Sequence, residues 1–404
     1  MGYHEPGKWW VSPENYEPEV QEKFNFPKKI EFLDTTLRDG EQQPSIILTK
    51  DEKVDIARKL SELGVHRIEA GTPAVLKEDE EAIREICSLG LKSDIYAFVR
   101  CMEKDMLLAK DCGVDGVIAE MIGSEHMLRF AKKWEVDRAI KASIEATLIA
   151  KELGLKVTYF PADSSRAEYD FLVDMLQAII EGGHVDAITL VDTMGVFSPE
   201  GAANRVRKLK NRFPSIPVEV HFHDDYAMGV STTIAGLAAG AEVAHVTVNG
   251  IGERAGGAQL EAVALGLEAL YGVKTGLDLS KFKEVSDFVT ERTRVPMSPT
   301  KPVVGDKIFL WETGLPSSLW ENVKDIDPLI MLPYMYTLTG QKEPYLLLGK
   351  KSGKDNLRVW LENNNIDFPE EKSGDLLQKI KEKSYLEKRD LTNEEFLEIV
   401  RLFD

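Results

Sequence analysis

Short apolar segments alternate with longer amphipathic segments eight times between residues 29 and 276. The apolar segments are rich in β-branched residues and are typical of strands, whereas the segments between them have helical periodicity. Near-continuous apolar strands that are each followed by a helix predict a parallel sheet buried on both faces. Eight such units in about 245 residues favour a closed barrel over an open sheet. We therefore predict an α/β fold, a (β/α)8 TIM barrel.

The rest of the chain lacks this alternation. Residues 1–28 are polar and aromatic, which predicts an N-terminal arm ahead of a barrel domain at 29–276. Prolines recur through residues 277–345, which indicates an irregular connector. Residues 346–404 contain three amphipathic segments and are expected to form a small, mainly helical C-terminal subdomain.

Charge and composition restrict the class of partner. The 404 residues carry a formal net charge of −18, so we expect no nucleic acid and no anionic membrane among the partners. There is no long apolar run and no cationic, apolar N-terminus, which argues against a membrane span or a signal peptide. Three cysteines without metal-type spacing fit a reducing compartment, and we expect a cytoplasmic protein.

Two histidines lie two residues apart at the end of the seventh predicted strand, in the segment Val218–Asp225. Side chains at i and i+2 share one face of a strand, so both imidazoles point the same way. The pair alone fits either two hydrogen-bonded core histidines or part of a metal site. The first predicted strand adds a carboxylate, and the set leaves open positions on a six-coordinate divalent ion. We predict Asp34, His221 and His223 as metal ligands, with Arg38 stabilising an oxyanion on the bound carbonyl.

Other polar side chains lie near the predicted strand ends, where barrel enzymes place their active sites. The candidates for this site are Gln42, Glu69, Arg100, His126, Asp163 and Thr193.

The segment Leu33–Gln42, which reads LDTTLRDGEQ, resembles the signature of the DRE-TIM metallolyase superfamily. Its Claisen-condensing branch includes 2-isopropylmalate, homocitrate and citramalate synthases, and hydroxymethylglutaryl-CoA lyase is a further member. The segments His221–Asp225, Asp192–Gly195 and Asn249–Gly256 resemble further family elements in the correct order. Leu348–Gly353 resembles part of the synthases' C-terminal subdomain.

The resemblance implies a chemistry for the candidate residues. Asp34, His221 and His223 would bind a divalent metal (Mg, Mn or Zn), and a 2-oxo acid would chelate it. Arg38 would polarise the keto group, and Thr193 would hold the substrate carboxylate. An acyl-CoA, acetyl-CoA by resemblance, would supply an enolate that attacks the keto carbon, and thioester hydrolysis would release a 2-alkylmalate-type product. From these candidates we assign catalytic roles to Arg38, Glu69, His126 and Asp163, and substrate binding to Arg38, Gln42, Arg100 and Thr193. The relatives also suggest a homodimer.

Several positions depart from the synthase pattern. Ala162 stands where the synthases carry a glutamate, and the segment Trp311–Pro316 lacks both histidines of the corresponding element. A general base must lie within hydrogen-bond reach of the proton it takes, and Asp163, Glu312 and His126 are the possible substitutes. We expect a different oxo acid or acyl donor from that of isopropylmalate synthase.

Two alternatives remain beside the synthase. One is a metal-dependent carbon–carbon lyase or aldolase of the hydroxymethylglutaryl-CoA lyase type, although the cysteine of that branch after strand eight is absent. The other is a catalytically silent homologue that binds metal and an oxo acid.

Overall fold

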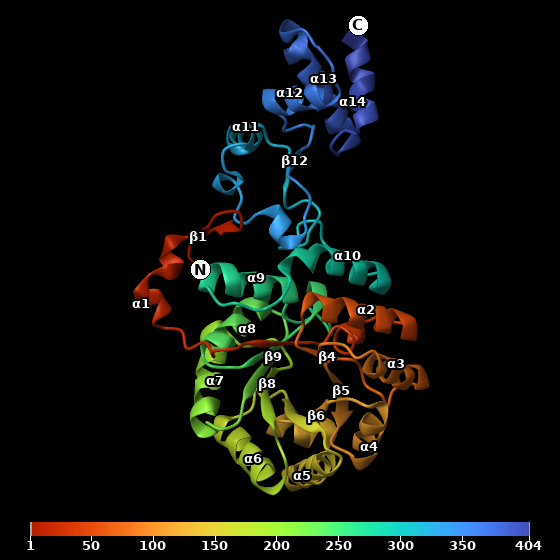
Figure 1. Cartoon of the computed structure of the whole chain (residues 1–404), viewed down its shortest axis with the longest axis vertical. Coiled ribbons are helices and arrows are strands. Elements are labelled where there is room, and N and C mark those ends of the chain that lie inside the picture. Colours follow the sequence, from red (N-terminus) through yellow and green to blue (C-terminus); the bar gives the residue numbers. More distant parts are fainter. Residues whose placement is uncertain (1, 404) are drawn as a thin grey trace. The chain divides into compact units, whose positions relative to one another are not determined.

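A computed structural model describes residues 2–403 of the chain, which divide into two compact units. One unit comprises residues 14–297, and the other joins residues 2–13 to the described residues from Ser298 onward. The larger unit is a closed barrel of eight parallel strands in the order β10-β3-β4-β5-β6-β7-β8-β9 (Figure 1). The predicted TIM barrel is confirmed.

Each barrel strand is followed by a helix, as the alternation in the sequence predicts. The strands are β3 (Glu31–Asp34), β4 (Arg67–Glu69), β5 (Asp94–Arg100), β6 (Gly116–Ile122), β7 (Lys156–Ala162), β8 (Ala187–Asp192), β9 (Val218–Phe222) and β10 (Val243–Val246). The helices that follow them are α2 (Lys50–Leu63), α3 (Lys77–Ser88), α4 (Glu103–Cys112), α5 (Val136–Glu152), α6 (Tyr169–Gly182), α7 (Pro199–Arg212), α8 (Gly229–Ala238) and α9 (Leu260–Tyr271). A further helix, α10 (Phe282–Thr293), completes this unit.

The first strand is shorter than the sequence predicts. The apolar pattern places a strand over 29–38, but β3 ends at Asp34 and the chain then turns. The carbonyl of Thr35 accepts hydrogen bonds from the backbone N–H groups of Arg38 (3.0 Å) and Gly40 (3.1 Å). Arg38 and Asp39 therefore lie on a tight turn beyond the strand, and this difference determines which carboxylate reaches the site.

Side chains from alternate strand positions fill the barrel. Leu33, Tyr96, Ile118, Phe160, Val191 and Val243 form one buried cluster. Deeper in the barrel than its mouth, a cluster of charged side chains takes the place of apolar ones. There Glu219 accepts from Arg67 Nη1 (2.7 Å) and lies 2.8 Å from His245 Nε2. Burial opposes ionisation of Glu219, but the bonds from His245 and Arg67 outweigh it and lower its pKa.

We expect Glu219→Ala to destabilise the protein by about 3–5 kcal/mol, because it leaves the fully buried imidazole of His245 without its partner and removes the buried partner of Arg67. Glu31→Ala is the matched control, since Glu31 pairs with the same Arg67 (2.7 Å) from a partly exposed position. It should cost about 1 kcal/mol or less. Urea unfolding followed by circular dichroism measures both free energies. Equal losses would contradict a dominant role for the buried pair.

The smaller unit has its own cores and two short sheets. Strands β1 (His4–Glu5) and β2 (Trp9–Trp10) pair antiparallel, and β11 (Leu310–Trp311) and β12 (Tyr345–Leu346) pair parallel. Its helices are α11 (Gly314–Val323), α12 (Lys354–Asn363), α13 (Ser373–Glu387) and α14 (Asn393–Val400), and they confirm a helical C-terminal region. The predicted connector over 277–345 contains the helix α11. Pro316 lies in the first turn of α11, where a missing N–H costs no helical bond.

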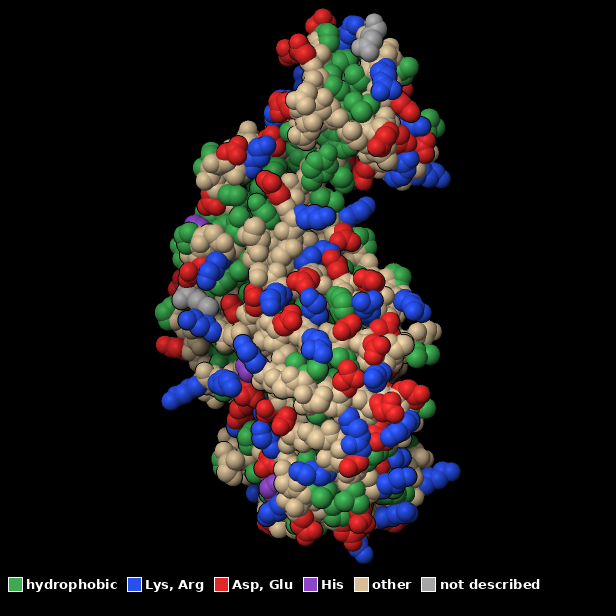
Figure 2. Space-filling model, turned by 45° about the vertical axis from the view of Figure 1, so that its right-hand side comes forward, with side chains coloured by type: hydrophobic (Ala, Val, Ile, Leu, Met, Phe, Trp, Pro, Cys, Tyr) green, Lys and Arg blue, Asp and Glu red, His purple; other side chains and the backbone are tan. Residues whose placement is uncertain are grey.

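Acidic and basic side chains are interspersed on the face seen in Figure 2. No basic tract stands out on that face, in keeping with the net charge of −18. Within residues 2–403, none of the helices combines the length and the apolar character needed to cross a membrane.

Candidate active site

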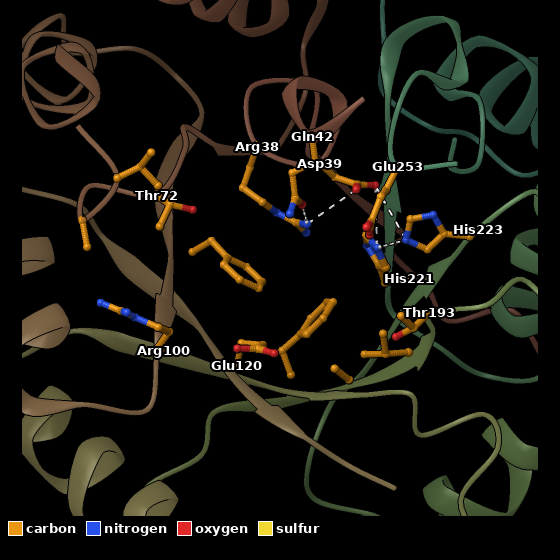
Figure 3. Close-up of a pocket in the computed structure, with 16 residues that line it drawn as sticks. Arg38, Asp39, Gln42, Thr72, Arg100, Glu120, Thr193, His221, His223 and Glu253 are labelled. Atoms are coloured by element: carbon orange, nitrogen blue, oxygen red, sulfur yellow. Dashed lines mark hydrogen bonds and ion pairs between the residues drawn. The ribbon is translucent and has the colours of Figure 1, made fainter. Parts of the chain in front are cut away.

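A cavity of about 450 Å³ lies at the carboxyl ends of the barrel strands (Figure 3). Its walls include Arg38, Asp39, Gln42, Thr72, Phe98, Arg100, Glu120, Phe160, Ala162, Val191, Thr193, His221, His223 and Glu253. The walls therefore combine two aromatic rings with acidic, basic and imidazole groups. Of the ten residues assigned from the sequence, Arg38, Gln42, Arg100, Thr193, His221 and His223 line this cavity, whereas Asp34, Glu69, His126 and Asp163 do not.

One carboxylate and two imidazoles converge on one side of the cavity. The Nε2 atoms of His221 and His223 are 3.4 Å apart and lie 3.9 and 4.0 Å from Asp39 Oδ2. Three such ligand atoms within 4.8 Å of one another match the spacing around a single metal ion, and no other group of this kind occurs among the described residues.

The surroundings of this group fit a cation. Both carboxylate oxygens of Asp39 are buried and accept no hydrogen bond from the described residues. His223 Nδ1 lies 3.1 Å from the carbonyl of Gly256, which fixes that nitrogen as the donor and leaves Nε2 with a free lone pair. Burial, followed by the fields of His223 and Arg38, lowers the pKa of His221 well below its usual value. The neutral imidazole is the form that ligates metals.

The structure brings Asp39, and not the predicted Asp34, together with His221 and His223. Asp34 is the last residue of β3, and its Oδ1 accepts from the backbone N–H of Thr36 (2.9 Å), so this side chain supports the turn. That turn carries Asp39 to the mouth, beside the two imidazoles. The sequence contains the signal for this position, because Asp39 follows Arg38 within the same motif.

Asp34 should leave a signature in the pH dependence of stability. Burial raises the pKa of Asp34 to about 7, despite the opposing bonds from Thr36. The pKa of Asp34 is higher in the folded state than in the unfolded state. The contribution of Asp34 to the free energy of unfolding is therefore fully present below about pH 4 and is lost as the pH rises to about 7. In metal-free protein, Asp34→Asn should gain about 2–3 kcal/mol relative to wild type between pH 5 and pH 8. Chemical unfolding at both pH values measures this, and parallel curves for the two proteins would contradict it.

Arg38 is buried and held from two sides. Its Nε donates to Glu69 Oε2 (2.8 Å) and its Nη1 donates to Gln42 Oε1 (2.8 Å). The guanidinium also lies 4.3 Å from the ring centre of Phe98. Nη2 has no partner among the described residues and is the donor left for a ligand. Glu69 and Gln42, which the sequence assigns to catalysis and substrate binding, thus orient Arg38.

Asp163 forms a second polar cluster beside the cavity. Its carboxylate accepts from Ser124 Oγ (2.6 Å) and Arg166 Nε (2.6 Å), and His126 Nε2 lies 2.9 Å away. The backbone N–H of Asp163 donates to Thr193 Oγ1 (2.8 Å). The backbone of Asp163 therefore holds the Thr193 hydroxyl, and Thr193 lines the cavity.

Arg100 lines the cavity, but its guanidinium is already paired. Nε and Nη2 donate to the two carboxylate oxygens of Asp105 (2.8 and 2.9 Å), near the start of α4. This bidentate pair uses two of the five guanidinium N–H groups, so the remaining donors of Arg100 are still available for the predicted contact with substrate.

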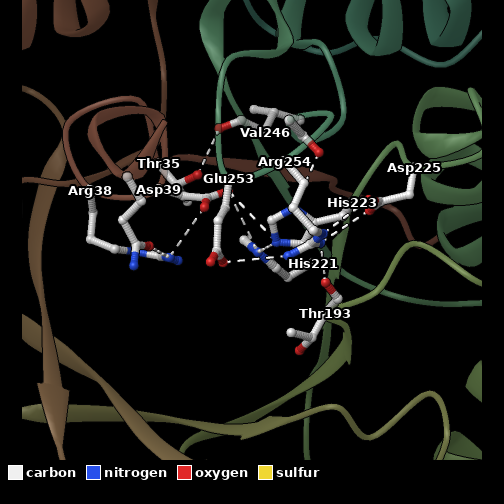
Figure 4. A network of polar contacts seen from close by, with 12 residues as sticks. Thr35, Arg38, Asp39, Thr193, His221, His223, Asp225, Val246, Glu253 and Arg254 are labelled. Atoms are coloured by element: carbon white, nitrogen blue, oxygen red, sulfur yellow. Dashed lines mark hydrogen bonds and ion pairs between the residues drawn. The ribbon is translucent and has the colours of Figure 1, made fainter. Parts of the chain in front are cut away.

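The loop after β10 contributes residues that the sequence reasoning missed. Arg254 donates to both oxygens of Asp225 (2.9 and 3.0 Å) and to the carbonyl of Thr193, so it connects three loops (Figure 4). Gly256 adopts φ +85°, and a Cβ there would lie 1.9 Å from the carbonyl oxygen of Gly250. Only glycine fits at this position, which sets the carbonyl that His223 contacts.

A parallel eight-stranded barrel with a carboxylate and two imidazoles at its mouth defines a candidate metal-dependent barrel enzyme. Residues 29–289 match the HMGL-like family, and the chain belongs to this family. This confirms the resemblance drawn from the sequence motifs.

Several curated proteins are similar over most of the chain. A 2-isopropylmalate synthase from Methanocaldococcus jannaschii is 35% identical over 359 residues, covering 89% of this chain and 68% of the relative. A homocitrate synthase, AksA, from Methanothermobacter thermautotrophicus is 35% identical over 376 residues, 93% of each chain. A putative (R)-citramalate synthase, CimA, from Archaeoglobus fulgidus is 37% identical over 357 residues, covering 88% of this chain and 71% of the relative.

Solved structures support the fold. The hydroxymethylglutaryl-CoA lyase of Bacillus subtilis superposes with a TM-score of 0.62 at 20% identity, covering 67% of this chain and 96% of the lyase.

Proposed function

We propose that this protein is a divalent-metal-dependent acyltransferase that condenses an acyl-CoA with a 2-oxo acid. The observation that carries the proposal is the buried group of Asp39, His221 and His223 beside Arg38. The relatives named as isopropylmalate, homocitrate and citramalate synthases support a 2-alkylmalate-type product. Acetyl-CoA is the proposed acyl donor.

Asp39, His221 and His223 are the proposed ligands, which leaves open positions for a substrate. Two imidazoles and one carboxylate suit Mg²⁺, Mn²⁺ or Zn²⁺. When bound, the cation would supply Lewis acidity to the carbonyl of a chelating oxo acid.

Two side chains would act on the oxo acid directly. The unpartnered Nη2 of Arg38 would donate to the keto oxygen as negative charge develops on it. The Thr193 hydroxyl, oriented by the backbone N–H of Asp163, would donate to the substrate carboxylate. Glu69 and Gln42 would hold the Arg38 guanidinium in position without contacting the substrate.

The proposed reaction moves one proton and forms one carbon–carbon bond. A base takes a proton from the methyl group of acetyl-CoA, the resulting carbanion attacks the keto carbon, and the keto oxygen is protonated. Water then cleaves the thioester and releases the CoA thiol. Asp163 and Glu312 are poor candidates for the base, because Arg166 (2.6 Å) and Lys351 (2.5 Å) respectively hold their carboxylates.

The proposal predicts thiol release that depends on both the metal and the oxo acid. Purified protein should be incubated with Mn²⁺ or Mg²⁺, acetyl-CoA and a panel of 2-oxo acids, with free thiol as the readout. Cleavage of a hydroxyacyl-CoA without thiol release from acetyl-CoA would favour the lyase instead. Binding of metal and oxo acid without any turnover would identify a silent homologue.

We also propose a homodimer, on the strength of the resemblance to the synthases. Sedimentation equilibrium of the full chain tests this, with a mass of twice 45.3 kDa as the expected result.

A further inference from the structure

Glu120 is a carboxylate in the cavity wall for which the sequence reasoning found no role. It lies on β6 two residues after Ile118, whose side chain belongs to the buried cluster inside the barrel. Because residues at i and i+2 share a face of a strand, Glu120 also points inward. Figure 3 shows it across the cavity from His221.

The Glu120 side chain makes no hydrogen bond or ion pair of 4 Å or less within the described part of the chain. Its cross-strand neighbour Arg100 is engaged by Asp105 (2.8 Å), and Arg38 is engaged by Glu69 (2.8 Å). Burial raises the pKa of Glu120, against the fields of Lys132, Arg38 and Arg100. A partly buried acid without a direct partner costs folding free energy, and a group of this kind in a cavity wall is a candidate for contact with a ligand.

The position of Glu120 in the cavity determines which part of a substrate can contact it. Phe160 is its register partner on β7, and Phe98 lies on the other neighbouring strand, β5. Glu120 precedes the end of β6 by two residues and therefore lies deeper than the pair Ile122 and Ala162 at the rim. A long CoA thioester must enter from the open mouth. The group that reaches this depth is the substituent of the smaller substrate.

We propose that Glu120 determines specificity for the 2-oxo acid, accepting a side chain with a hydrogen-bond donor such as a hydroxyl and rejecting a second carboxylate. A carboxylate acceptor on the strand between those of Phe98 and Phe160, whose rings pack edge to face 5.6 Å apart, pairs well with a hydroxyl, whereas two like charges in a poorly solvated cavity repel each other. Ala162 on the neighbouring strand β7 carries no charge, so Glu120 is the acidic side chain on this side of the cavity. The inference rests on the proposed condensation and narrows its substrate class to monocarboxylic 2-oxo acids.

The test compares wild type with Glu120→Gln on three probes: 2-oxobutyrate, 4-hydroxy-2-oxobutyrate and 2-oxoglutarate. The glutamine keeps the size of the side chain but loses its charge and offers donors to a carboxylate. Wild type should prefer the hydroxy acid and disfavour the diacid, each by about tenfold in kcat/KM relative to 2-oxobutyrate. Glu120→Gln should raise the ratio of diacid to 2-oxobutyrate by about tenfold or more. Glu152→Gln, an exposed change on α5, is the matched control and should leave the ratios unchanged.

Two results would overturn the inference. One is an unchanged ratio in Glu120→Gln, and the other is a common loss for all three acids, which would indicate a role outside substrate selection. Calorimetric binding of the three acids to Mn²⁺-loaded protein provides a second readout. If acetyl-CoA releases no thiol with any acid, the proposed condensation is wrong. The relative affinities of wild type and Glu120→Gln for the three acids still test the role of Glu120.

Discussion

Asp39→Asn is expected to abolish catalysis and to weaken Mn²⁺ binding by at least about a hundredfold. The substitution keeps the size of the side chain but removes the one negative charge in the group formed with His221 and His223. Isothermal titration of EDTA-treated protein with Mn²⁺ measures the affinity. Thermal unfolding of the same samples shows whether the variant is folded.

Asp34→Asn is the matched control for this experiment. The asparagine still offers a carbonyl oxygen to the backbone N–H of Thr36, so the turn that carries Asp39 should persist. We expect Mn²⁺ affinity within about fivefold of wild type, because Asp34 is outside the group of ligand atoms. The opposite ranking, with Asp34→Asn losing the metal and Asp39→Asn retaining it, would restore the assignment made from the sequence.

Arg38→Lys is expected to lower kcat by about 10²–10³-fold while changing the KM for the oxo acid only a few-fold. Arg38 donates to Glu69 and Gln42 and still has Nη2 free for the substrate. A lysine ammonium cannot donate to Glu69, Gln42 and the substrate at the same time. The lysine retains a positive charge beside the buried Glu69, which limits the effect on folding.

Steady-state kinetics of thiol release separates kcat from KM for this variant. Glu69→Gln provides the comparison, because it loosens Arg38 without removing it and should cost less than Arg38→Lys. A rise in KM alone for Arg38→Lys would show that Arg38 binds the substrate without stabilising the transition state.

The fold was predictable because its signal repeats. Eight apolar strands separated by amphipathic helices leave few alternatives to a barrel, and errors of a few residues at the ends of β3 did not alter the topology. The carboxylate of the site was harder to place, because the motif holds two aspartates. Asp34 ends β3, whereas the turn after it carries Asp39 to the two imidazoles.

The roles of individual polar residues were harder to predict, because they depend on partners that are distant in sequence. Glu69 and Asp163 lie near strand ends, but Arg38 and Arg166 occupy their carboxylates. Glu120 was missed for the opposite reason. It lies inside an apolar strand, and the sequence does not show that Arg100, across the ladder, is paired with Asp105 instead.

The proposed condensation forms a new carbon–carbon bond between the acyl methyl carbon and the keto carbon of an oxo acid. It is tested most directly by incubating the Mn²⁺-loaded protein with acetyl-CoA labelled with ¹³C at the methyl carbon and with 2-oxobutyrate. We expect the label in the methylene carbon of a 2-ethylmalate product, as read by NMR, and no such product from Asp39→Asn. Recovery of all the label in acetate or in unreacted acetyl-CoA, from wild-type protein that binds both Mn²⁺ and the oxo acid, would contradict it.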